Sequence, residues 1–338
     1  MTRVLRSGIL TRGPETRAFE EEFAAYVGAK RAVACSSGTA ALWLAVSASN
    51  LSSGKKNSWM IPAITFAATK NAAQWDHIFG DVDRGTGLLA AHEVYGATNC
   101  GIPVLYAGQS TDRFFTTNIF DACHALGSWH TANSKVGSWN GPATCFSFHP
   151  AKTITTGEGG MVVASNEEFE RDLRRLRDNG IERPQTPGVE PWMYDNTEFG
   201  LNFHMSEMAA ALGRSQLKRI DETLAKRREL AAAYLRCLPD SAKPIITDHS
   251  RNACHIFPVL IDFEELGVSR AALMNRMLDR WKIATQVHYI PLMPLPGAME
   301  FYRRELTLPL HCAMDLSDVL HVCDALDAIC RKPEITHE

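Results

Sequence analysis

The feature that most constrains this chain is a lysine set between two short β-type runs. The run Thr144 to Phe148 stops at a proline, Lys152 follows two residues later, and a turn rich in threonine and glycine leads to the apolar run Met161 to Val163. A loop lysine is ordinarily a solvated surface residue, but here short, apolar and hydroxyl side chains surround it, and Glu158 is the only acid close in sequence. Desolvation lowers the pKa of a lysine and makes its amine a nucleophile, which is what an imine to an aldehyde cofactor requires.

The sequence around this lysine resembles a known motif. Residues 147–152 read Ser-Phe-His-Pro-Ala-Lys, and residues 154–160 read Ile-Thr-Thr-Gly-Glu-Gly-Gly. This wording is similar to the lysine motif of the DegT/DnrJ-type sugar aminotransferases, which use pyridoxal 5'-phosphate (PLP) and have an aspartate-aminotransferase-like fold, PLP fold type I. The resemblance implies an α/β fold. A large domain over residues 1–236 would carry a central, mostly parallel sheet flanked by helices, and residues 237–338 would form a smaller C-terminal α+β domain.

Length and composition exclude several other classes of protein. The chain has 338 residues and a formal net charge of -3, so nothing favours nucleic acid or an anionic membrane surface as a partner. We find no apolar run long enough to span a membrane and no apolar signal core at the N-terminus. The nine cysteines are scattered without Cys-x-x-Cys spacing, which is typical of reduced thiols in a cytoplasmic protein. The twelve histidines show no metal-ligand spacing, so no metal site is expected.

A strand, a tight turn and a helix start near the N-terminus predict either an anion site or a simple helix cap. The strand covers residues 31–35, the turn reads Ser-Ser-Gly-Thr, and the helix covers residues 40–48. Backbone N–H groups at such a helix start can bind an anion, whereas Ser37 or Thr39 could equally well only cap the helix. In the resembled family, the Ser-Gly-Thr-Ala-Ala-Leu turn holds the cofactor phosphate. The resemblance therefore implies phosphate contacts from this turn and from a later serine hydroxyl: Gly38, Thr39, Ala40 and Ser147.

Three further residues are candidates for contact with the cofactor ring. Asp121 follows a β-type run over residues 117–120, where a carboxylate would lie at the ligand edge of a parallel sheet and could keep a pyridine nitrogen protonated; a turn or cap residue is the ordinary alternative. The family motif is Glu-Asp-Ala-Ala-His-Ala-Leu-Gly, which implies that His124 lies near the phenolic oxygen of PLP. Here Phe120 and Cys123 replace the acidic residue and an alanine. Phe66 is a core residue by composition alone, but the family places an aromatic here against the pyridine face.

The resemblance also implies substrate contacts and a second subunit. Residues 200–207 are similar to the family's Gly-Tyr-Asn-Tyr-Arg-Met-Ser-Glu, in which the asparagine reaches the phosphate of the neighbouring subunit's cofactor, so Asn202 takes that role in an expected homodimer. His204 stands where the family has arginine. Asn179 opens a long loop that the family uses near the sugar. His288 and Tyr289 match the family's His-Tyr-x-Pro-Leu motif near the substrate. By itself, His288 would be a structural histidine and Asn202 a turn residue.

Periodicity and turn signals give a coarse set of expected elements. Helices are expected over residues 15–27, 40–48, 166–178, 206–236 and 269–281, from residue 316, and in a segment that ends at Trp75. Strands are expected over residues 31–35, 59–62, 78–82, 117–120, 144–148, 161–163, 256–261 and 282–287, and a strand followed by a turn is expected over residues 102–109. Residues 84–101 show no clear period, and prolines 184, 187 and 191 mark a long loop.

These observations predict a PLP-dependent aminotransferase that converts a nucleotide-linked keto sugar, of the 4-keto-6-deoxy class, to the amino sugar. By family analogy glutamate would be the amino donor, and the motif wording is closest to that of the UDP-4-keto-6-deoxy-hexosamine aminotransferases. Lys152 would carry the imine and then move the proton as general base and acid. A PLP sugar dehydratase is an alternative, although that branch replaces the lysine with histidine. A silent sensor or structural member remains open because the segments before and after residues 102–109 are short, and a cysteine hydrolase has no motif behind it.

Overall fold

The computed structural model describes residues 1–74, 76–90, 98–111, 115–138, 141–183, 190 and 192–330. Its largest sheet has the strand order β1-β9-β8-β5-β4-β2-β3. The strands are β1 (Ala32–Cys35), β2 (Trp59–Pro62), β3 (His77–Gly80), β4 (Cys100–Gly101), β5 (Thr117–Asp121), β8 (Ala143–Ser147) and β9 (Gly160–Ala164). Strand β9 runs antiparallel to its neighbours β1 and β8, and the other pairings are parallel. The expected mostly parallel sheet is confirmed.

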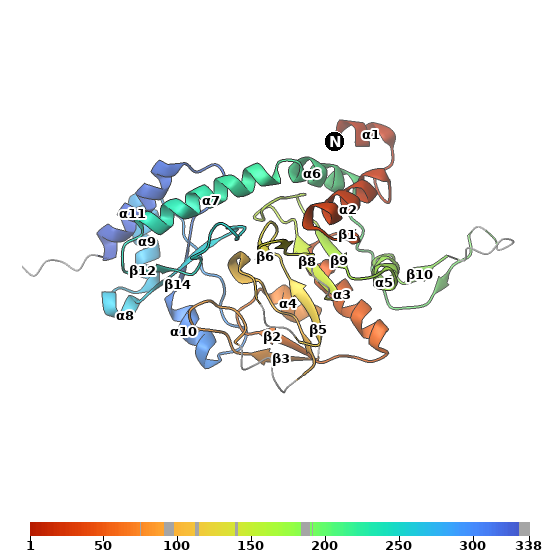
Figure 1. Cartoon of the computed structure of the whole chain (residues 1–338), viewed down its shortest axis with the longest axis horizontal. Coiled ribbons are helices and arrows are strands. Elements are labelled where there is room, and N and C mark those ends of the chain that lie inside the picture. The colour runs from red at the N-terminus through yellow and green to blue at the C-terminus, as the bar shows by residue number, and fades with distance from the viewer. Residues whose placement is uncertain are drawn as a thin grey trace, which may run out of the picture.

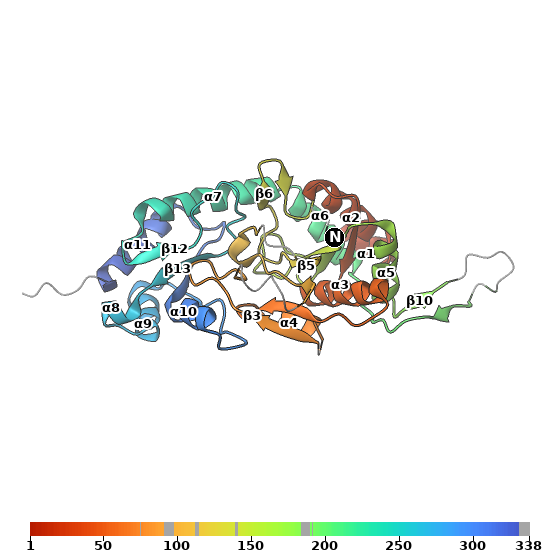
Figure 2. The same ribbon diagram turned by 60° about the horizontal axis from the view of Figure 1, so that its bottom comes forward.

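Successive side chains along the strands point to opposite faces of this sheet, and both faces are buried. In β9, Met161 and Val163 belong to one hydrophobic core, and Val162 and Ala164 belong to another. The first core lies under α2 (Pro14–Val27) and α6 (Glu207–Leu217), and the second lies under α3 (Gly38–Ser53), α4 (Ala67–Ala72) and α5 (Glu167–Arg177). Figures 1 and 2 show α2 and α6 on the side of the sheet opposite α3 and α4. This is the layered α/β architecture that the sequence predicted.

A second group of elements follows along the chain. The long helix α7 (Ile220–Cys237) packs against α9 (Arg270–Trp281), α11 (Leu316–Cys330) and a small antiparallel sheet around a core of its own. That sheet has the order β12 (Ala242–Pro244), β13 (Phe257–Ile261) and β14 (Glu305–Leu308). The remaining described elements are α1 (Thr2–Ser7), β6 (Trp129–Thr131), β7 (Ser134–Lys135), β10 (Ile181–Glu182), β11 (Asp195–Asn196), α8 (Phe263–Leu266) and α10 (Pro296–Arg304).

The two groups of elements are joined by apolar packing and by polar contacts, among them those of the Asp81 carboxylate. Phe301 of α10 packs on Tyr106 with ring centroids 5.6 Å apart, within a core that both groups share. The carboxylate of Asp81, just after β3, accepts hydrogen bonds of 2.8 Å from the backbone N–H groups of Gly297 and Ala298. These N–H groups lie in the first turn of α10, where a helix has no internal partner for them. Asp81 of the first group of elements therefore caps helix α10 of the second group.

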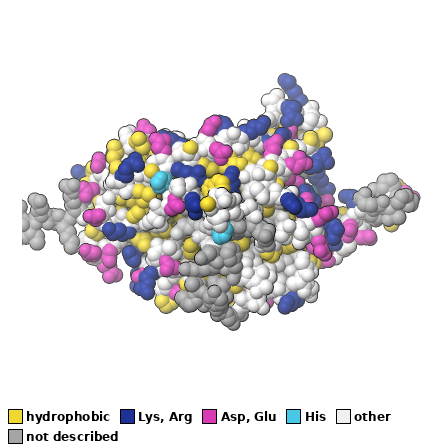
Figure 3. Space-filling model, in the orientation of Figure 1, with side chains coloured by type: hydrophobic (Ala, Val, Ile, Leu, Met, Phe, Trp, Pro, Cys, Tyr) yellow, Lys and Arg dark blue, Asp and Glu magenta, His cyan; other side chains and the backbone are white. Residues whose placement is uncertain are grey.

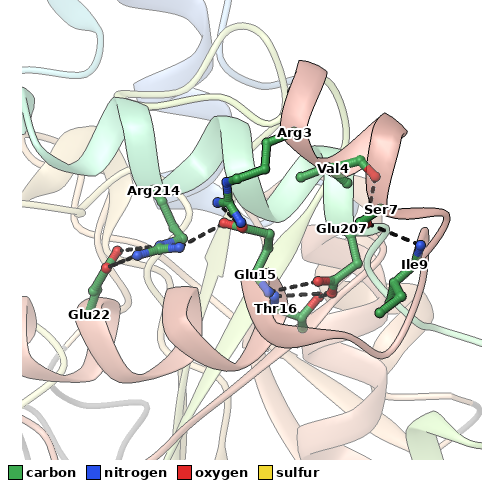
Figure 4. Close-up of polar contacts among 9 residues, drawn as sticks. All are labelled: Arg3, Val4, Ser7, Ile9, Glu15, Thr16, Glu22, Glu207 and Arg214. Atoms are coloured by element: carbon green, nitrogen blue, oxygen red, sulfur yellow. Dashed lines mark hydrogen bonds and ion pairs between the residues drawn. The ribbon is translucent and has the colours of Figure 1, made fainter.

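A buried carboxylate also caps the N-terminal helix α2, as Figure 4 shows. Glu207, at the start of α6, is fully buried, and its carboxylate accepts hydrogen bonds from the backbone N–H groups of Glu15 (2.7 Å) and Thr16 (3.1 Å) in the first turn of α2. Glycine 13 stands at the N-cap of α2 and has no side chain to do this. Arg214 of α6 binds Glu15 and Glu22 of α2 at 2.7 and 2.6 Å. These contacts explain why α2 and α6 pack together.

Several expected boundaries were wrong. The single helix over 206–236 is broken at residues 218–219 into α6 and α7, and α4 ends at Ala72; Trp75 and prolines 184, 187 and 191 lie outside the described residues. Of the strand and turn expected over 102–109, the turn is present at Tyr106–Gly108, but the strand is only the bridge of Val104 with Asp121, just after β4, because Pro103 has no N–H to donate and Ala107 has a φ of 54°. The expected strand over 282–287 makes one bridge, Gln286 with Thr307, and the strand beside β13 is β14, which the sequence had not indicated.

Charge is mixed over the surface. Figure 3 shows basic and acidic side chains interspersed on one face of the described residues. No helix in the part of the chain that the structure describes is long and apolar enough to cross a membrane.

Candidate active site

A pocket of about 600 Å³ opens at the carboxyl edge of the large sheet, where β5 and β8 end, and the second group of elements closes its other side. This is the edge at which parallel α/β sheets bind ligands, and the volume suits a cofactor with a small substrate. Its lining includes nine of the residues that the sequence singled out: Gly38, Thr39, Phe66, Asp121, His124, Ser147, Lys152, His288 and Tyr289.

One end of the pocket can hold an anion. Ser37 caps α3, since its Oγ accepts the N–H of Ala40 at 3.0 Å. The cap thus uses Ser37 and leaves Thr39 on the pocket wall, while Ala40 is absent from the lining. The N–H groups of Gly38 and Thr39 lie in the first helical turn and have no partner within the helix. A side chain on residue 38 would approach Cβ of Ser147 to 2.7 Å, so the close approach of the Ser147 hydroxyl to this helix start requires glycine.

The buried carboxylate of Asp121 lies at the end of β5. Asp121 is 6% exposed, and its Oδ2 accepts a hydrogen bond of 2.8 Å from the hydroxyl of Thr69, which in turn accepts one of 2.7 Å from Thr65. Its Oδ1 accepts the N–H of Cys123 at 3.2 Å. Among the described residues, no lysine, arginine or histidine lies within 4.0 Å of this carboxylate. A buried carboxylate without a cationic partner, facing a pocket, fits a ligand that carries a protonated nitrogen.

Lys152 lies on the loop after β8, where its backbone N–H closes a turn onto the carbonyl of His149 at 2.8 Å. Its side chain is half-buried, and it is the only lysine or arginine among the described residues that line the pocket. Phe66, the residue before α4, is 61% exposed, and its ring centroid lies 5.9 Å from that of Tyr289. An aromatic that is exposed on a pocket wall is available for stacking, so Phe66 is not the core residue that composition alone favoured.

Neutral rings line another part of the pocket, and we call His124, His255, His288 and Tyr289 the histidine wall. Burial lowers the pKa of His124 and His255 well below the ordinary histidine value, and the charge of Lys152 lowers both further. Burial, followed by the charge of Lys152, lowers the pKa of His288 to about 4. Burial raises the pKa of the Tyr289 phenol above its ordinary value. The whole wall is therefore uncharged at neutral pH.

Hydrogen bonds define the tautomer of His124. Its Nδ1 accepts the backbone N–H of Ala107 at 3.3 Å, so Nε2 carries the proton and donates it to Oη of Tyr289, 2.9 Å away. The hydroxyl proton of Tyr289 is then free to donate into the pocket. His124 comes from the segment after β5 and Tyr289 from the loop before α10, so this bond connects the two sides of the pocket.

Sequence reasoning missed His255, Thr307 and the buried carboxyl behind them, Glu305. His255 lies two residues before β13, is 6% exposed and has no hydrogen-bond partner for Nδ1 among the described residues. Thr307 lines the pocket from β14. The available signal was a polar side chain inside or beside an apolar run, which is unusual in a buried strand.

Asn179 and Asn202 lie away from this pocket. The neighbouring residue Asp178 forms an isolated bridge with Asn202, and the N–H of Asn179 donates to the carbonyl of Leu201 at 3.2 Å. Both asparagines are exposed and neither belongs to the pocket lining. The structure therefore brings these two residues together, but apart from the other predicted site residues of the same chain.

Pyridoxal phosphate fits four features of this pocket: the start of α3, which we call the anion cup, the lysine, the buried carboxylate without a cationic partner among the described residues, and the exposed aromatic ring. The fold and the pocket therefore define a PLP enzyme of fold type I. Comparison with known proteins agrees. The sequence model of the DegT/DnrJ/EryC1/StrS aminotransferase family matches residues 1–327. The chain belongs to this family and is a PLP-dependent sugar aminotransferase, as the resemblance in the sequence implied.

The chain is similar over nearly its whole length to several relatives. It is 34% identical over 365 residues to the UDP-4-amino-4,6-dideoxy-N-acetyl-beta-L-altrosamine transaminase of Campylobacter jejuni, covering 98% of this chain and 94% of the relative. It is 32% identical over 362 residues to the spore coat polysaccharide biosynthesis protein SpsC of Bacillus subtilis, with coverages of 96% and 92%.

Solved structures give the same result. Helicobacter pylori PseC, an aminotransferase involved in the biosynthesis of pseudoaminic acid, matches with a TM-score of 0.87 and 28% identity, over 97% of this chain and 94% of that one. DesI, solved in the presence of its TDP-sugar product, matches with a TM-score of 0.83 and 30% identity, over 97% and 88%.

Proposed function

We propose that this protein transfers the amino group of glutamate to a nucleotide-linked 4-keto-6-deoxy sugar, with the predicted site residues in the roles assigned below. The observation that carries the proposal is the presence of Lys152 and Asp121 in one pocket with the anion cup of α3. The names of the relatives support the substrate class, because one is a UDP-amino-sugar transaminase and another was solved with a TDP-sugar product.

The pocket residues divide the work. When bound, PLP supplies an aldehyde carbon and a ring that withdraws electrons. Lys152 Nζ would hold the cofactor at rest and, once released from it by the donor amine, would take a proton from the α-carbon of the donor and deliver it to the carbon that was the cofactor's aldehyde carbon. Lys152 is placed for this role because it is the only lysine or arginine among the described residues that line the pocket.

Asp121 and the helix start hold the cofactor in place. The carboxylate of Asp121, fixed by Thr69 and by the N–H of Cys123, accepts a hydrogen bond from the ring nitrogen and keeps it protonated. Gly38, Thr39 and Ser147 bind the phosphate, and Ala40 supports them only through its bond to the Ser37 cap. Phe66 stacks on the ring. The phosphate contacts retain the cofactor while Lys152 is detached from it.

We assign Asn202 to the phosphate site of a partner subunit and Asn179 to a contact with the sugar substrate, in a cytoplasmic homodimer. Their exposure, and their distance from the pocket of their own chain, support this assignment. Exposed apolar side chains on the chain segment between these asparagines, Trp192, Met193 and Phe199, suit an interface between subunits. We also propose a division into domains at residues 236/237, at the end of α7, since a separate core begins on that helix.

The test is a spectrum and a product analysis on the purified chain with PLP. The wild type should show an absorption band in the visible or near-ultraviolet that borohydride removes, and should aminate one member of a panel of UDP-, dTDP- and GDP-linked keto sugars with glutamate as donor. Lys152→Ala should lose the band and at least roughly 10³-fold in rate, whereas Lys226→Ala, at a partly exposed position of α7, should lose neither. A dehydrated sugar as product, or full activity of Lys152→Ala, would refute the proposal.

A further inference from the structure

Glu305 is a buried carboxyl group that the proposed chemistry does not use. It opens β14, is 0% exposed and is absent from the pocket lining. Its Oε2 accepts the backbone N–H of His288 at 3.0 Å, and its Oε1 accepts the hydroxyl of Thr307 at 2.6 Å. Oγ1 of Thr307 lies 2.9 Å from Nδ1 of His288. Three hydrogen bonds thus connect a carboxyl group outside the pocket to two side chains that line it.

The donors and acceptors give this connection a direction. An ionised carboxylate can only accept, so Thr307 must donate its single hydroxyl proton to Glu305. The oxygen of Thr307 then has only lone pairs to offer His288, so Nδ1 of His288 carries the ring proton. Nε2 is left as a lone pair and is the ring nitrogen available to a ligand.

We propose that Glu305 is a positioning residue for the sugar substrate: through Thr307 it fixes His288 as the tautomer that presents a hydrogen-bond acceptor to a hydroxyl or N–H group of the keto sugar. This inference rests on the proposed function, because it specifies how the sugar is recognised in the same pocket. It also separates the two neighbouring residues, since the free proton of Tyr289 makes that side chain a donor. A sugar is then recognised by one acceptor and one donor side by side.

The charged and polar groups around Glu305 determine the pH range in which His288 keeps this tautomer. Burial raises the pKa of Glu305 to about 7, against the opposing effects of Thr307, the His288 N–H, the Arg270 guanidinium and the Tyr106 hydroxyl. Below that pH the carboxyl takes up one proton from solvent and donates it to Thr307. The Thr307 hydroxyl then turns to donate to Nδ1, and the proton of His288 resides on Nε2. His288 itself stays neutral, because burial and Lys152 hold its pKa near 4.

Glu305→Gln should lock the reversed arrangement at every pH. The backbone N–H of His288 requires an acceptor, so the amide oxygen must face it and the amide NH₂ must donate to Thr307. Thr307→Val removes the link altogether, whereas Thr307→Ser keeps the hydroxyl. Glu300→Gln is the matched control, because Glu300 is a partly exposed glutamate of α10 paired with Arg84.

The first measurement uses the apoprotein labelled with ¹⁵N-histidine, with the signal of His288 assigned through a His288→Asn variant. In the wild type, nitrogen chemical shifts should report protonated Nδ1 above pH 7 and protonated Nε2 well below it. Glu305→Gln should report protonated Nε2 throughout, and Glu300→Gln should match the wild type. An identical tautomer and pH response in the wild type and in Glu305→Gln would overturn the inference, whatever the enzyme's activity.

The second measurement separates the two half-reactions of the holoenzyme. Glu305→Gln and Thr307→Val should each lower kcat/KM for the sugar by roughly tenfold at pH 8, the effect of one lost hydrogen bond. The ratio of the sugar half-reaction rate to the glutamate half-reaction rate should fall by the same factor. Thr307→Ser should restore that ratio. Equal losses in both half-reactions would overturn the positioning role. A wild type that aminates no sugar would refute the proposed function instead, and the tautomer measurement decides the inference separately.

Discussion

The two walls of the pocket differ in the chemical groups that they present and in the ligands that these groups suit. Asp121, Lys152 and the start of α3, which we call the cofactor wall, present fixed charges and unpaired N–H groups at the ends of parallel strands. The histidine wall presents rings that burial keeps neutral. Charges suit a cofactor with a phosphate and a protonated ring, and neutral donors and acceptors suit the hydroxyl groups of a sugar. Substitutions on the cofactor wall should therefore cost more than substitutions on the histidine wall.

The largest effect is expected for Asp121→Asn. An amide cannot stabilise a protonated ring nitrogen as a carboxylate does, so the rate of both half-reactions should fall by roughly 10³-fold. Stopped-flow measurement of the glutamate half-reaction checks this. Asp195→Asn, on the exposed strand β11, is the control. A loss confined to the sugar half-reaction would contradict the division between the walls.

A substitution on the histidine wall should instead change how the free energy of unfolding depends on pH. Below pH 6.5 an unfolded imidazole takes up a proton that folded His288 does not accept until about pH 4, so the free energy of unfolding falls as the pH drops through this window. The contribution of His288 is about 3 kcal/mol. Urea unfolding at pH 4 and pH 7 should show a smaller difference for His288→Gln than for the wild type. Exposed His311→Gln should keep the wild-type difference; a His288→Gln profile that matches it would contradict the prediction.

Gly38→Ala tests the cofactor wall without removing a charge. The new methyl group would meet Ser147 at 2.7 Å, and overpacking of this kind costs about 1–3 kcal/mol. The affinity for PLP should weaken by roughly 10- to 100-fold, measured by absorbance titration. Gly85→Ala is the control because its nearest neighbour, Asp83, lies 3.4 Å from the new atom. Unchanged affinity would show that the phosphate does not lie against this helix start.

The two walls also differ in how far the sequence revealed them. Asp121 and Ser147 stand at the ends of parallel strands, Lys152 lies on the loop after the second of them, and the sheet brings such ends to one edge. These contiguous motifs carried the family resemblance that grouped the three residues. The capping alternative for the Ser-Ser-Gly-Thr turn was also correct, because Ser37 caps α3 while Thr39 faces the pocket.

The histidine wall could not be grouped in this way. Thr307 and Glu305 reach His288 only because Gln286 bridges to Thr307 and β14 pairs with β13, and these pairings join residues far apart in the chain. The sequence placed a strand over 282–287 and none over 305–308, so the register that assembles this wall was not visible. Residues brought together by long-range pairing carry no local pattern to identify them.

The smallest effect is expected at the bond that joins the two sides. Tyr289→Phe removes the acceptor of the His124 Nε2 proton and the hydroxyl that faces the pocket, yet it leaves every charge of the cofactor wall in place. One neutral hydrogen bond contributes about 1 kcal/mol, so kcat/KM for the sugar should fall by roughly fivefold. The absorption band of bound PLP should stay within the wild-type range, since His124 keeps its bond to Ala107. A rate loss as large as that of Asp121→Asn would mean that Tyr289 acts on the cofactor, and the two walls would then be one catalytic unit.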